Sequence, residues 1–275
     1  MKPLYALRTR FGKHEEIVAE FLPPSRLYKE IFKKHSNRRA GDKEAAVFEK
    51  AKVMIMLSGV PAMPSRGQVM DFFSKKGYWV FYPRYRGTWE SSGKFLARSP
   101  HEDVIAVIDK LPRGFKDSWS VEQYKIKPEK IDIVASSFGG PAGIIASCDP
   151  RINKIILISP VVDWRADSKV EPLPLLYKLI KSGFGEAYRI DKKGWHKLMR
   201  GKFYNPAIIT DKIDGKKLFF VHAKDDDLAL VGPVIRFAKK VGAELLLLPR
   251  GGHLSSRAIL IPKIYRRVHK FLSAR

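Results

Sequence analysis

Short apolar runs separated by longer amphipathic stretches recur along most of the chain. The last five of the seven runs are apolar throughout rather than alternating, which is typical of strands covered on both faces. We therefore expect a sheet with helices on both sides. The runs predicted to be strands are Glu16–Phe21, Val53–Leu57, Trp79–Tyr82, Ile131–Ala135, Lys154–Ile158, Leu218–His222 and Glu244–Leu248.

The stretches between these runs carry helical patterns. Strands that alternate with helices favour a mostly parallel sheet, so the predicted fold class is α/β. The 275 residues suffice for one such domain over 1–275, in which 1–50 would supply N-terminal strands and a polar loop. The predicted helices are Gln68–Lys76, His101–Leu111, Phe138–Ser147, Pro233–Val241 and Ile261–Leu272.

One predicted helix carries its own start signal. Ser99 precedes Pro100, and Glu102 follows three residues after the serine. Proline is favoured at the first helical position, and a serine with an acid three residues later forms a capping box. We therefore expect Ser99 to be the N-cap of the helix that begins near His101.

An interval without a strong strand runs from Pro160 to Lys217. It is too long for a plain loop and is rich in aromatic residues, so we predict a small helical lid over approximately 163–215. Loops at the carboxyl edge of an α/β sheet are where ligands bind. The lid would then supply apolar residues to a substrate pocket. The alternative is that the interval forms a packed subdomain that does not contact a ligand. The candidate pocket residues are Trp164, Tyr177, Phe184 and Tyr188.

A serine-containing turn follows the apolar run that ends at Val134. The sequence Ala135-Ser136-Ser137-Phe138-Gly139-Gly140 continues into a predicted helix. A strand, tight turn and helix with small residues two positions on either side of a serine lifts that hydroxyl out of the sheet. If the serine is Ser137, these positions hold Ala135 and Gly139, whereas Ser136 would place Val134 and Phe138 there. We therefore choose Ser137 as the candidate nucleophile, with an ordinary glycine-rich connection as the alternative.

A serine nucleophile needs a base, and the base needs an acid that fixes its tautomer. His253 follows Arg250-Gly251-Gly252 just after a predicted strand, where a glycine loop can bring an imidazole over the serine. The other six histidines lie in polar, helical or strand-end surroundings. His253 is therefore the candidate base.

Three consecutive carboxylates, Asp225, Asp226 and Asp227, follow the predicted strand that ends at His222. They lack the spacing and the glycine of a calcium loop. They could instead cap the following helix, and Asp163 is a competing acid. The chain order of serine, this acidic group and then His253 is the order found in α/β-hydrolases.

Jointly, these motifs resemble the α/β-hydrolase superfamily, and most closely the catalytic domain of its prolyl-oligopeptidase and dienelactone-hydrolase-like branch. Ala135–Gly140 is similar to that branch's G-x-S-[FY]-G-G, and 222–226 is similar to its H-G-x-x-D. Pro83–Gly87 resembles P-x-x-R-G, and Gly252-His253 completes a likeness that runs from Val53 to the C-terminus. The H-G-x-x-D pattern implies that Asp226 is the acid.

The resemblance also implies two backbone donors for an oxyanion. One is the N–H of Phe138, directly after the candidate nucleophile. The other comes from the loop Leu57-Ser58-Gly59-Val60-Pro61, where Val60 is the candidate because proline has no N–H, and Gly59 would allow close approach. The chain departs from the family pattern at Ala135, Ser58 and Ala223, which loosens its placement within the superfamily.

The net charge of +24 is the most unusual bulk property of the chain. Such a charge is compatible with nucleic acid or with acidic partners. The basic residues are nevertheless spread along the whole chain, and the densest cluster, 33–39, reads as a solvated loop. No dedicated nucleic-acid-binding motif is visible.

The remaining sequence features limit the chemistry and the cellular location that we expect. Cys148 is the one cysteine, so no intrachain disulfide is expected, and together with the absence of a signal-like N-terminus this favours a cytoplasmic location. No apolar run reaches the roughly 18 residues of a membrane span. Neither a dinucleotide fingerprint nor zinc-type spacing is present, so we expect no cofactor and no metal.

The sequence therefore predicts a serine hydrolase that cleaves carboxylic esters of small molecules through an acyl-enzyme. A peptidase or acyl-peptide hydrolase acting on short peptides is the alternative within the same chemistry. A non-catalytic or nucleic-acid-binding protein on the same fold is the alternative outside it. The oligomeric state is not predicted.

Overall fold

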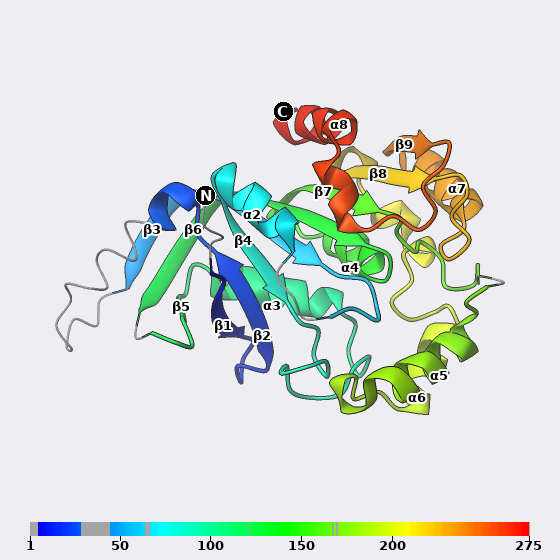
Figure 1. Cartoon of the computed structure of the whole chain (residues 1–275), viewed down its shortest axis with the longest axis horizontal. Helices are drawn as coiled ribbons and strands as arrows, with labels where there is room; N and C mark the ends of the chain where they lie inside the picture. The colour runs from blue at the N-terminus through cyan, green and yellow to red at the C-terminus, as the bar shows by residue number, and fades with distance from the viewer. Residues whose placement is uncertain are drawn as a thin grey trace.

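A single twisted sheet forms the centre of the computed structural model, which describes residues 5–28, 45–63, 67–120, 122–166, 168 and 170–274 (Figure 1). The strand order is β1-β2-β4-β3-β6-β7-β8-β9, and β5 pairs with β6. The strands are β1 (Leu7–Phe11), β2 (Ile17–Leu22), β3 (Ala46–Leu57), β4 (Tyr78–Pro83), β5 (Phe115–Lys116), β6 (Gln123–Ser136), β7 (Ile152–Ile158), β8 (Leu218–Ala223) and β9 (Glu244–Leu248).

The sheet is mostly parallel, as predicted. The pairs that join β4, β3, β6, β7, β8 and β9 are all parallel, while β1–β2, β2–β4 and β5–β6 are antiparallel. The carboxyl ends of the six parallel strands therefore meet at one edge. The loops that carry Ser137, Asp226 and His253 all leave the sheet at that edge.

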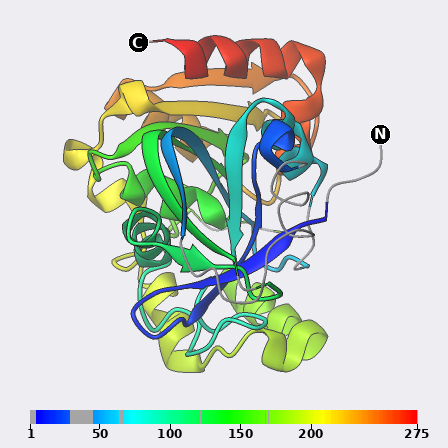
Figure 2. The same cartoon turned by 90° about the vertical axis from the view of Figure 1, so that its left-hand side faces the viewer.

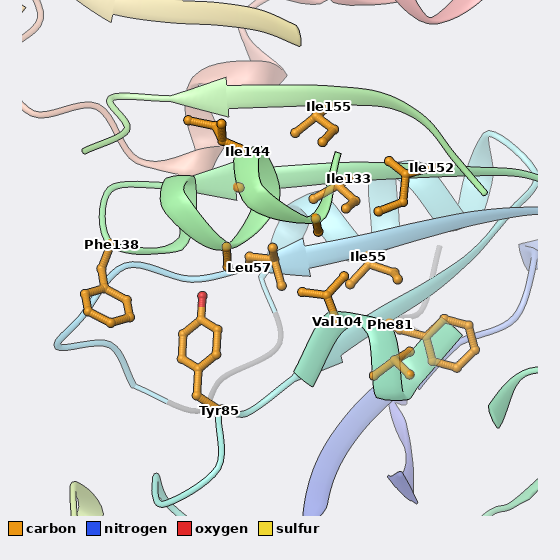
Figure 3. Close-up of a cluster of buried hydrophobic side chains, with 14 of the residues drawn as sticks. Ile55, Leu57, Phe81, Tyr85, Val104, Ile133, Phe138, Ile144, Ile152 and Ile155 are labelled. Atoms are coloured by element: carbon orange, nitrogen blue, oxygen red, sulfur yellow. The ribbon is translucent and has the colours of Figure 1, made fainter. Parts of the chain in front are cut away.

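Helices cover both faces of the sheet, and alternate residues of each strand point to opposite faces. Val53, Ile55 and Leu57 of β3 pack in the core with α3, α4 and α7 (Figure 3). Met54 and Met56 pack in the second core, with α2 and α8. The helices are α2 (Gln68–Lys75), α3 (His101–Lys110), α4 (Gly139–Ala146), α5 (Leu173–Phe184), α6 (Lys192–Met199), α7 (Val231–Val241) and α8 (Pro262–Ser273).

Several element boundaries differ from the prediction. β3 and β6 begin well before Val53 and Ile131. The prediction missed their first halves because these alternate between exposed positions and buried or partly buried ones instead of forming apolar runs. β1 and β5 were not predicted. In β1, Arg8 and Arg10 interrupt the apolar pattern, while Leu7, Thr9 and Phe11 point inward.

The start of α3 also differs from the prediction. The helix begins at His101 with Pro100 as its N-cap, and the Ser99 hydroxyl does not cap it. That hydroxyl lies 2.7 Å from Nδ1 of His101, which draws it away from the helix. Half of the capping box remains, since the Glu102 carboxylate accepts the Ser99 N–H at 3.3 Å.

The interval between β7 and β8 is helical. It contains α5, α6 and the short 3₁₀ turns Gly185–Ala187, Pro206–Ile208, Thr210–Lys212 and Gly215–Lys217. In both whole-molecule views α5 and α6 lie together at the end opposite α8 (Figure 1 and Figure 2). Backbone bonds from Trp89 N–H to Ala187 and from Phe95 N–H to Arg189 tie this segment to the loop after β4.

Two expectations from the sequence concern the basic cluster and membrane-spanning helices. The basic cluster at 33–39 lies outside the described residues. Within the described part of the chain, no helix is long and apolar enough to cross a membrane.

Candidate active site

The turn between β6 and α4 holds Ser137 in a left-handed backbone conformation, with φ of +50°. Such a conformation costs a non-glycine residue on the order of 1–3 kcal/mol and persists only where surrounding contacts fix it. Here the Ser137 N–H donates to the Ile158 carbonyl at 3.1 Å. The Ser137 carbonyl accepts from Gly140 at 2.9 Å and from Val161 at 3.1 Å. The turn is therefore clamped to the end of β7.

Small residues beside Ser137 let the strand, the helix and two loops meet. A methyl group at Gly139 would lie 2.7 Å from the carbonyl oxygens of Leu57 and Ser58, and one at Gly140 would lie 2.4 Å from Pro160. Real side-chain carbons do not approach backbone so closely. Glycine is thus required at both positions. Gly143 similarly leaves room for Ala135, the residue that departs from the family's glycine.

His253 and Asp226 form a hydrogen-bonded pair. Nδ1 of His253 lies 3.0 Å from Oδ2 and 3.1 Å from Oδ1 of Asp226. The carboxylate is buried, and it also accepts the N–H groups of Leu228 at 3.1 Å and Ala229 at 2.9 Å. Burial acts to raise the pKa of Asp226, but the bonds from His253 and Ala229 outweigh it, and the pKa lies below its ordinary value. Asp226 is therefore ionised at neutral pH.

The neighbouring aspartates have different roles. Asp225 accepts the backbone N–H groups of Gly251 at 3.3 Å and Gly252 at 2.9 Å, which fixes the loop just before His253. The competing acid, Asp163, is paired with Arg165 at 2.9 Å and accepts a bond from Asn205 at 2.9 Å. Of these acids, Asp226 is the one that meets His253.

Ser137 and His253 border the same two adjoining cavities, of about 70 Å³ and about 410 Å³. The smaller cavity is enclosed by the 160–176 segment and the loop after β8, and the larger by the loop after β3 and residues 254–257. No direct hydrogen bond between the two side chains is formed within the described residues. Because Nδ1 of His253 faces Asp226, Nε2 is the nitrogen left for the cavity.

The loop after β3 lies against the serine. A methyl group at Gly59 would come within 3.1 Å of the Ser137 Cβ, and Val60 borders both cavities. Among the described residues, the N–H groups of Val60 and Phe138 donate to no protein acceptor. Both residues line the smaller cavity, so two backbone N–H groups at residues that border it have no protein acceptor among the described residues.

The four aromatic residues expected in a substrate pocket are placed differently from one another. Trp164 borders the smaller cavity and packs on Phe138. Tyr188 instead bonds to the backbone of Ala62 and borders a separate hollow of about 10 Å³. Tyr177 packs on Trp195 within the segment between β7 and β8. Phe184 packs between aromatic rings, those of Trp89 and Tyr188.

A second histidine, His222, contacts Asp226. The sequence does not predict this contact, because His222 lies at the end of a predicted strand and belongs to no catalytic loop. It is fully buried, and its Nε2 lies 2.7 Å from the Ala229 carbonyl and 3.3 Å from Oδ2 of Asp226. A carbonyl oxygen only accepts, so Nε2 carries the hydrogen. Burial lowers the pKa of His222, and the side chain is neutral.

Other neighbours of the site also gave no motif signal. Ser159, at the end of β7, bonds to Asp226 and accepts the Leu254 N–H at 3.1 Å, so it ties two loops together. The Tyr204 hydroxyl donates to the Phe138 carbonyl at 2.6 Å and accepts the Ala142 N–H at 3.0 Å. No group of three or more His, Cys, Asp or Glu side chains within the described ranges could hold a metal ion.

Solved structures share the overall fold of this chain. The Pyrococcus furiosus esterase Pf2001 superposes with a TM-score of 0.63 over 98% of this chain and 90% of the esterase, at 18% identity. This chain has the α/β-hydrolase fold. No protein-family profile and no curated protein sequence matches it.

Two peptidases contain the same α/β-hydrolase fold within longer chains. Pyrococcus horikoshii acylaminoacyl peptidase matches with a TM-score of 0.59 and 15% identity over 98% of this chain. Porphyromonas gingivalis dipeptidyl peptidase 4 matches with a TM-score of 0.60 and 17% identity over the same share. The present chain spans 40% of the first and 35% of the second. At these identities the likeness concerns the fold.

Proposed function

We propose that this α/β-hydrolase chain is a serine hydrolase that cleaves carboxylic esters, with Ser137 as nucleophile, His253 as base and Asp226 as the acid that orients it. The observation that carries the proposal is the pair of His253 and a buried, ionised Asp226 at a cavity shared with a serine in a clamped turn. A neutral imidazole beside a carboxylate gains stabilisation on taking up a proton.

The reaction would proceed in two halves. The Ser137 hydroxyl attacks the ester carbonyl and passes its proton to Nε2 of His253, which then protonates the leaving alcohol. In the second half, His253 takes a proton from the water that attacks the acyl-enzyme, and it returns this proton to the Ser137 oxygen as the bond to the acyl group breaks and the acid is released. A substrate that brings Ser137 and His253 into hydrogen-bond contact would complete the arrangement, since such contacts are often long without substrate.

The N–H groups of Phe138 and Val60 would stabilise the negative oxygen of each tetrahedral intermediate. Both groups lack a protein acceptor within the described residues and lie beside Ser137, and Gly59 keeps the second loop close. Loss of one such donor typically costs about 3–4 kcal/mol of transition-state stabilisation.

The helical segment over approximately 163–215 would act as a lid. Trp164 and its neighbours enclose the smaller cavity, which suits an apolar acyl or alcohol group. Peptide or acyl-peptide hydrolysis is the second candidate function, favoured by the likeness in fold to an acylaminoacyl peptidase. Ester hydrolysis leads because the chain matches an esterase over most of both chains.

A chain-length series of p-nitrophenyl esters, measured beside aminoacyl and prolyl arylamides, tests the proposal. We expect ester turnover in the wild type and a loss of about 10⁴-fold or more in kcat for Ser137→Ala and for His253→Ala. Ser136→Ala, the adjacent serine, is the matched control and should keep its activity. Full activity in Ser137→Ala would refute the assignment, and turnover of arylamides alone would favour the peptidase.

A further inference from the structure

One carboxylate borders both cavities beside the candidate nucleophile. Glu171, just before α5, lines the smaller and the larger cavity together with Ser137 and His253. Among the described residues that line these cavities, Asp163 is the other acid and Arg257 is the one lysine or arginine. Of these three charged residues, Glu171 is therefore the one that borders both cavities.

The two acids differ in what balances their charge. Asp163 is paired with Arg165 and accepts a bond from Asn205. Within the described residues, Glu171 forms no ion pair. Its carboxyl group is partly buried, and burial raises its pKa, against the opposing effect of His253. A partly buried carboxylate without a cation is stabilised by any positive group that enters the cavity.

The position of Glu171 is fixed by the loop that carries the candidate acid. Its backbone N–H donates to the Ser168 hydroxyl at 3.0 Å, and that hydroxyl donates to the Asp227 carbonyl at 2.6 Å. Asp227 directly follows Asp226. The backbone that carries the Glu171 side chain is thus tied to the loop that carries Asp226, the partner of His253.

The sign of this charge is opposite to that of the whole molecule, whose net charge is +24. A general preference for anions would be expected from the long-range field alone. At short range, however, the unpaired carboxylate favours cations and repels acids. The local and the global charge therefore predict opposite substrate preferences, which an experiment can separate.

We propose that Glu171 is a specificity residue that binds a positively charged nitrogen of the substrate, so that the site prefers esters bearing an ammonium group to neutral or acidic esters. The inference rests on the proposed function for its kinetic part, since it deepens the substrate class of that site. Its binding part stands without turnover, because an ammonium ion can occupy the cavity without being cleaved.

The kinetic experiment compares three ethyl esters below pH about 7, where an α-amino group is protonated. Ethyl alaninate carries the cation on the acyl side, ethyl propionate is neutral, and monoethyl succinate is acidic. We expect kcat/KM to be about 10-fold higher for the cationic ester than for the neutral one, as for one charge-assisted hydrogen bond. A thiocholine ester, which is cationic, and a 3,3-dimethylbutyl thioester, which is neutral, repeat the comparison with the charge on the leaving group.

Glu171→Gln removes the charge and keeps the shape of the side chain. The preference for the cation should disappear on at least one side of the ester, while hydrolysis of ethyl propionate stays within about 3-fold of wild type. Glu186→Gln, an equal change of net charge in the same segment, is the matched control and should keep the preference. A cation preference that persists in Glu171→Gln would overturn the inference.

A binding measurement separates failure of the inference from failure of the proposed function. Calorimetry with n-butylammonium and n-butanol should show about 10-fold tighter binding of the ammonium ion to Ser137→Ala, and the difference should vanish when Glu171→Gln is added. Equal binding of both probes would refute the role of Glu171 even if esters are hydrolysed. Tighter ammonium binding without hydrolysis of any ester would uphold it and refute the proposed function.

Discussion

At the scale of single residues, the site depends on a strained serine surrounded by positions too crowded for larger side chains. Ser137 keeps φ at +50° because Gly139 and Gly140 allow backbone and Pro160 to close around it. The sequence reveals this requirement, since Ser137 is the serine with small residues two positions to each side. It does not reveal Glu171 or His222, because their positions at the site depend on loops that only the fold brings together.

Gly59→Ala tests how closely the second loop must approach the serine. The added methyl group would lie 3.1 Å from the Ser137 Cβ, so loop and serine must move apart by a few tenths of an ångström. We expect kcat/KM for a p-nitrophenyl ester to fall by about 10²-fold, because small misplacement of reacting groups is costly. Gly183→Ala, where a methyl group meets nothing within 4 Å, is the control. Equal activity in both variants would show that the loop takes no part.

His222→Gln tests whether the buried histidine is neutral in the folded protein. Because burial lowers the pKa of His222, the unfolded state takes up a proton first as the pH falls. The contribution of His222 to stability is thus complete above the unfolded pKa of about 6.5 and is lost as the pH falls through that value, at about 1.4 kcal/mol for each unit by which the folded pKa is lowered.

Denaturant unfolding of both proteins between neutral and mildly acidic pH checks this expectation. The free energy of unfolding should fall less steeply on acidification in His222→Gln than in the wild type. His101, whose pKa burial also lowers, keeps its contribution in both proteins, so the difference between the two curves reports on position 222. Curves of equal slope would mean that the pKa of His222 is the same in the folded and the unfolded protein, and would contradict the expectation.

At the scale of elements, the segment between β7 and β8 holds the start of α4. The buried Tyr204 hydroxyl donates to the Phe138 carbonyl and accepts the Ala142 N–H, so it bridges these two backbone groups of the first turn of α4. Burial raises the pKa of Tyr204 well above its ordinary value, so the hydroxyl keeps its hydrogen and can serve both groups. The segment after β7 thereby stabilises the turn that carries Ser137.

Tyr204→Phe removes these two bonds and keeps the ring. We expect a loss of about 1–3 kcal/mol in the free energy of unfolding, because two buried backbone groups lose their partner. Tyr177→Phe is the control, since the Tyr177 hydroxyl forms no hydrogen bond within the described residues. Thermal or denaturant unfolding of both variants decides the matter, and equal losses would contradict the role assigned to the Tyr204 hydroxyl.

The elements themselves were predictable where the chain forms a short apolar run. β7, β8 and β9 appear in the sequence as apolar runs and form strands at nearly the predicted residues. β1 escaped prediction because Arg8 and Arg10 point outward between buried neighbours. The serine hydroxyl of Ser99 was expected to cap α3, but a nearby imidazole competes for it. Local pattern thus predicts burial well and side-chain pairing poorly.

At the scale of the whole molecule, the parallel sheet brings together segments that lie far apart in the chain. The candidate serine, acid and histidine follow β6, β8 and β9, whose carboxyl ends meet at one edge of the sheet. Parallel strands and right-handed crossovers make this convergence a property of the fold. Chain order could predict it, but the path of the long segment after β7, and with it the cavity walls, could not be predicted from local pattern.

Mass-spectrometric mapping of a fluorophosphonate adduct tests the central claim most directly, because the reagent marks an activated serine without needing the right substrate. One adduct should form in the wild type, on the peptide that contains Ser137. Labelling should be absent in Ser137→Ala, at least 10²-fold slower in His253→Ala and unchanged in Ser136→Ala. An adduct at another serine, or labelling at wild-type rate in His253→Ala, would contradict the account.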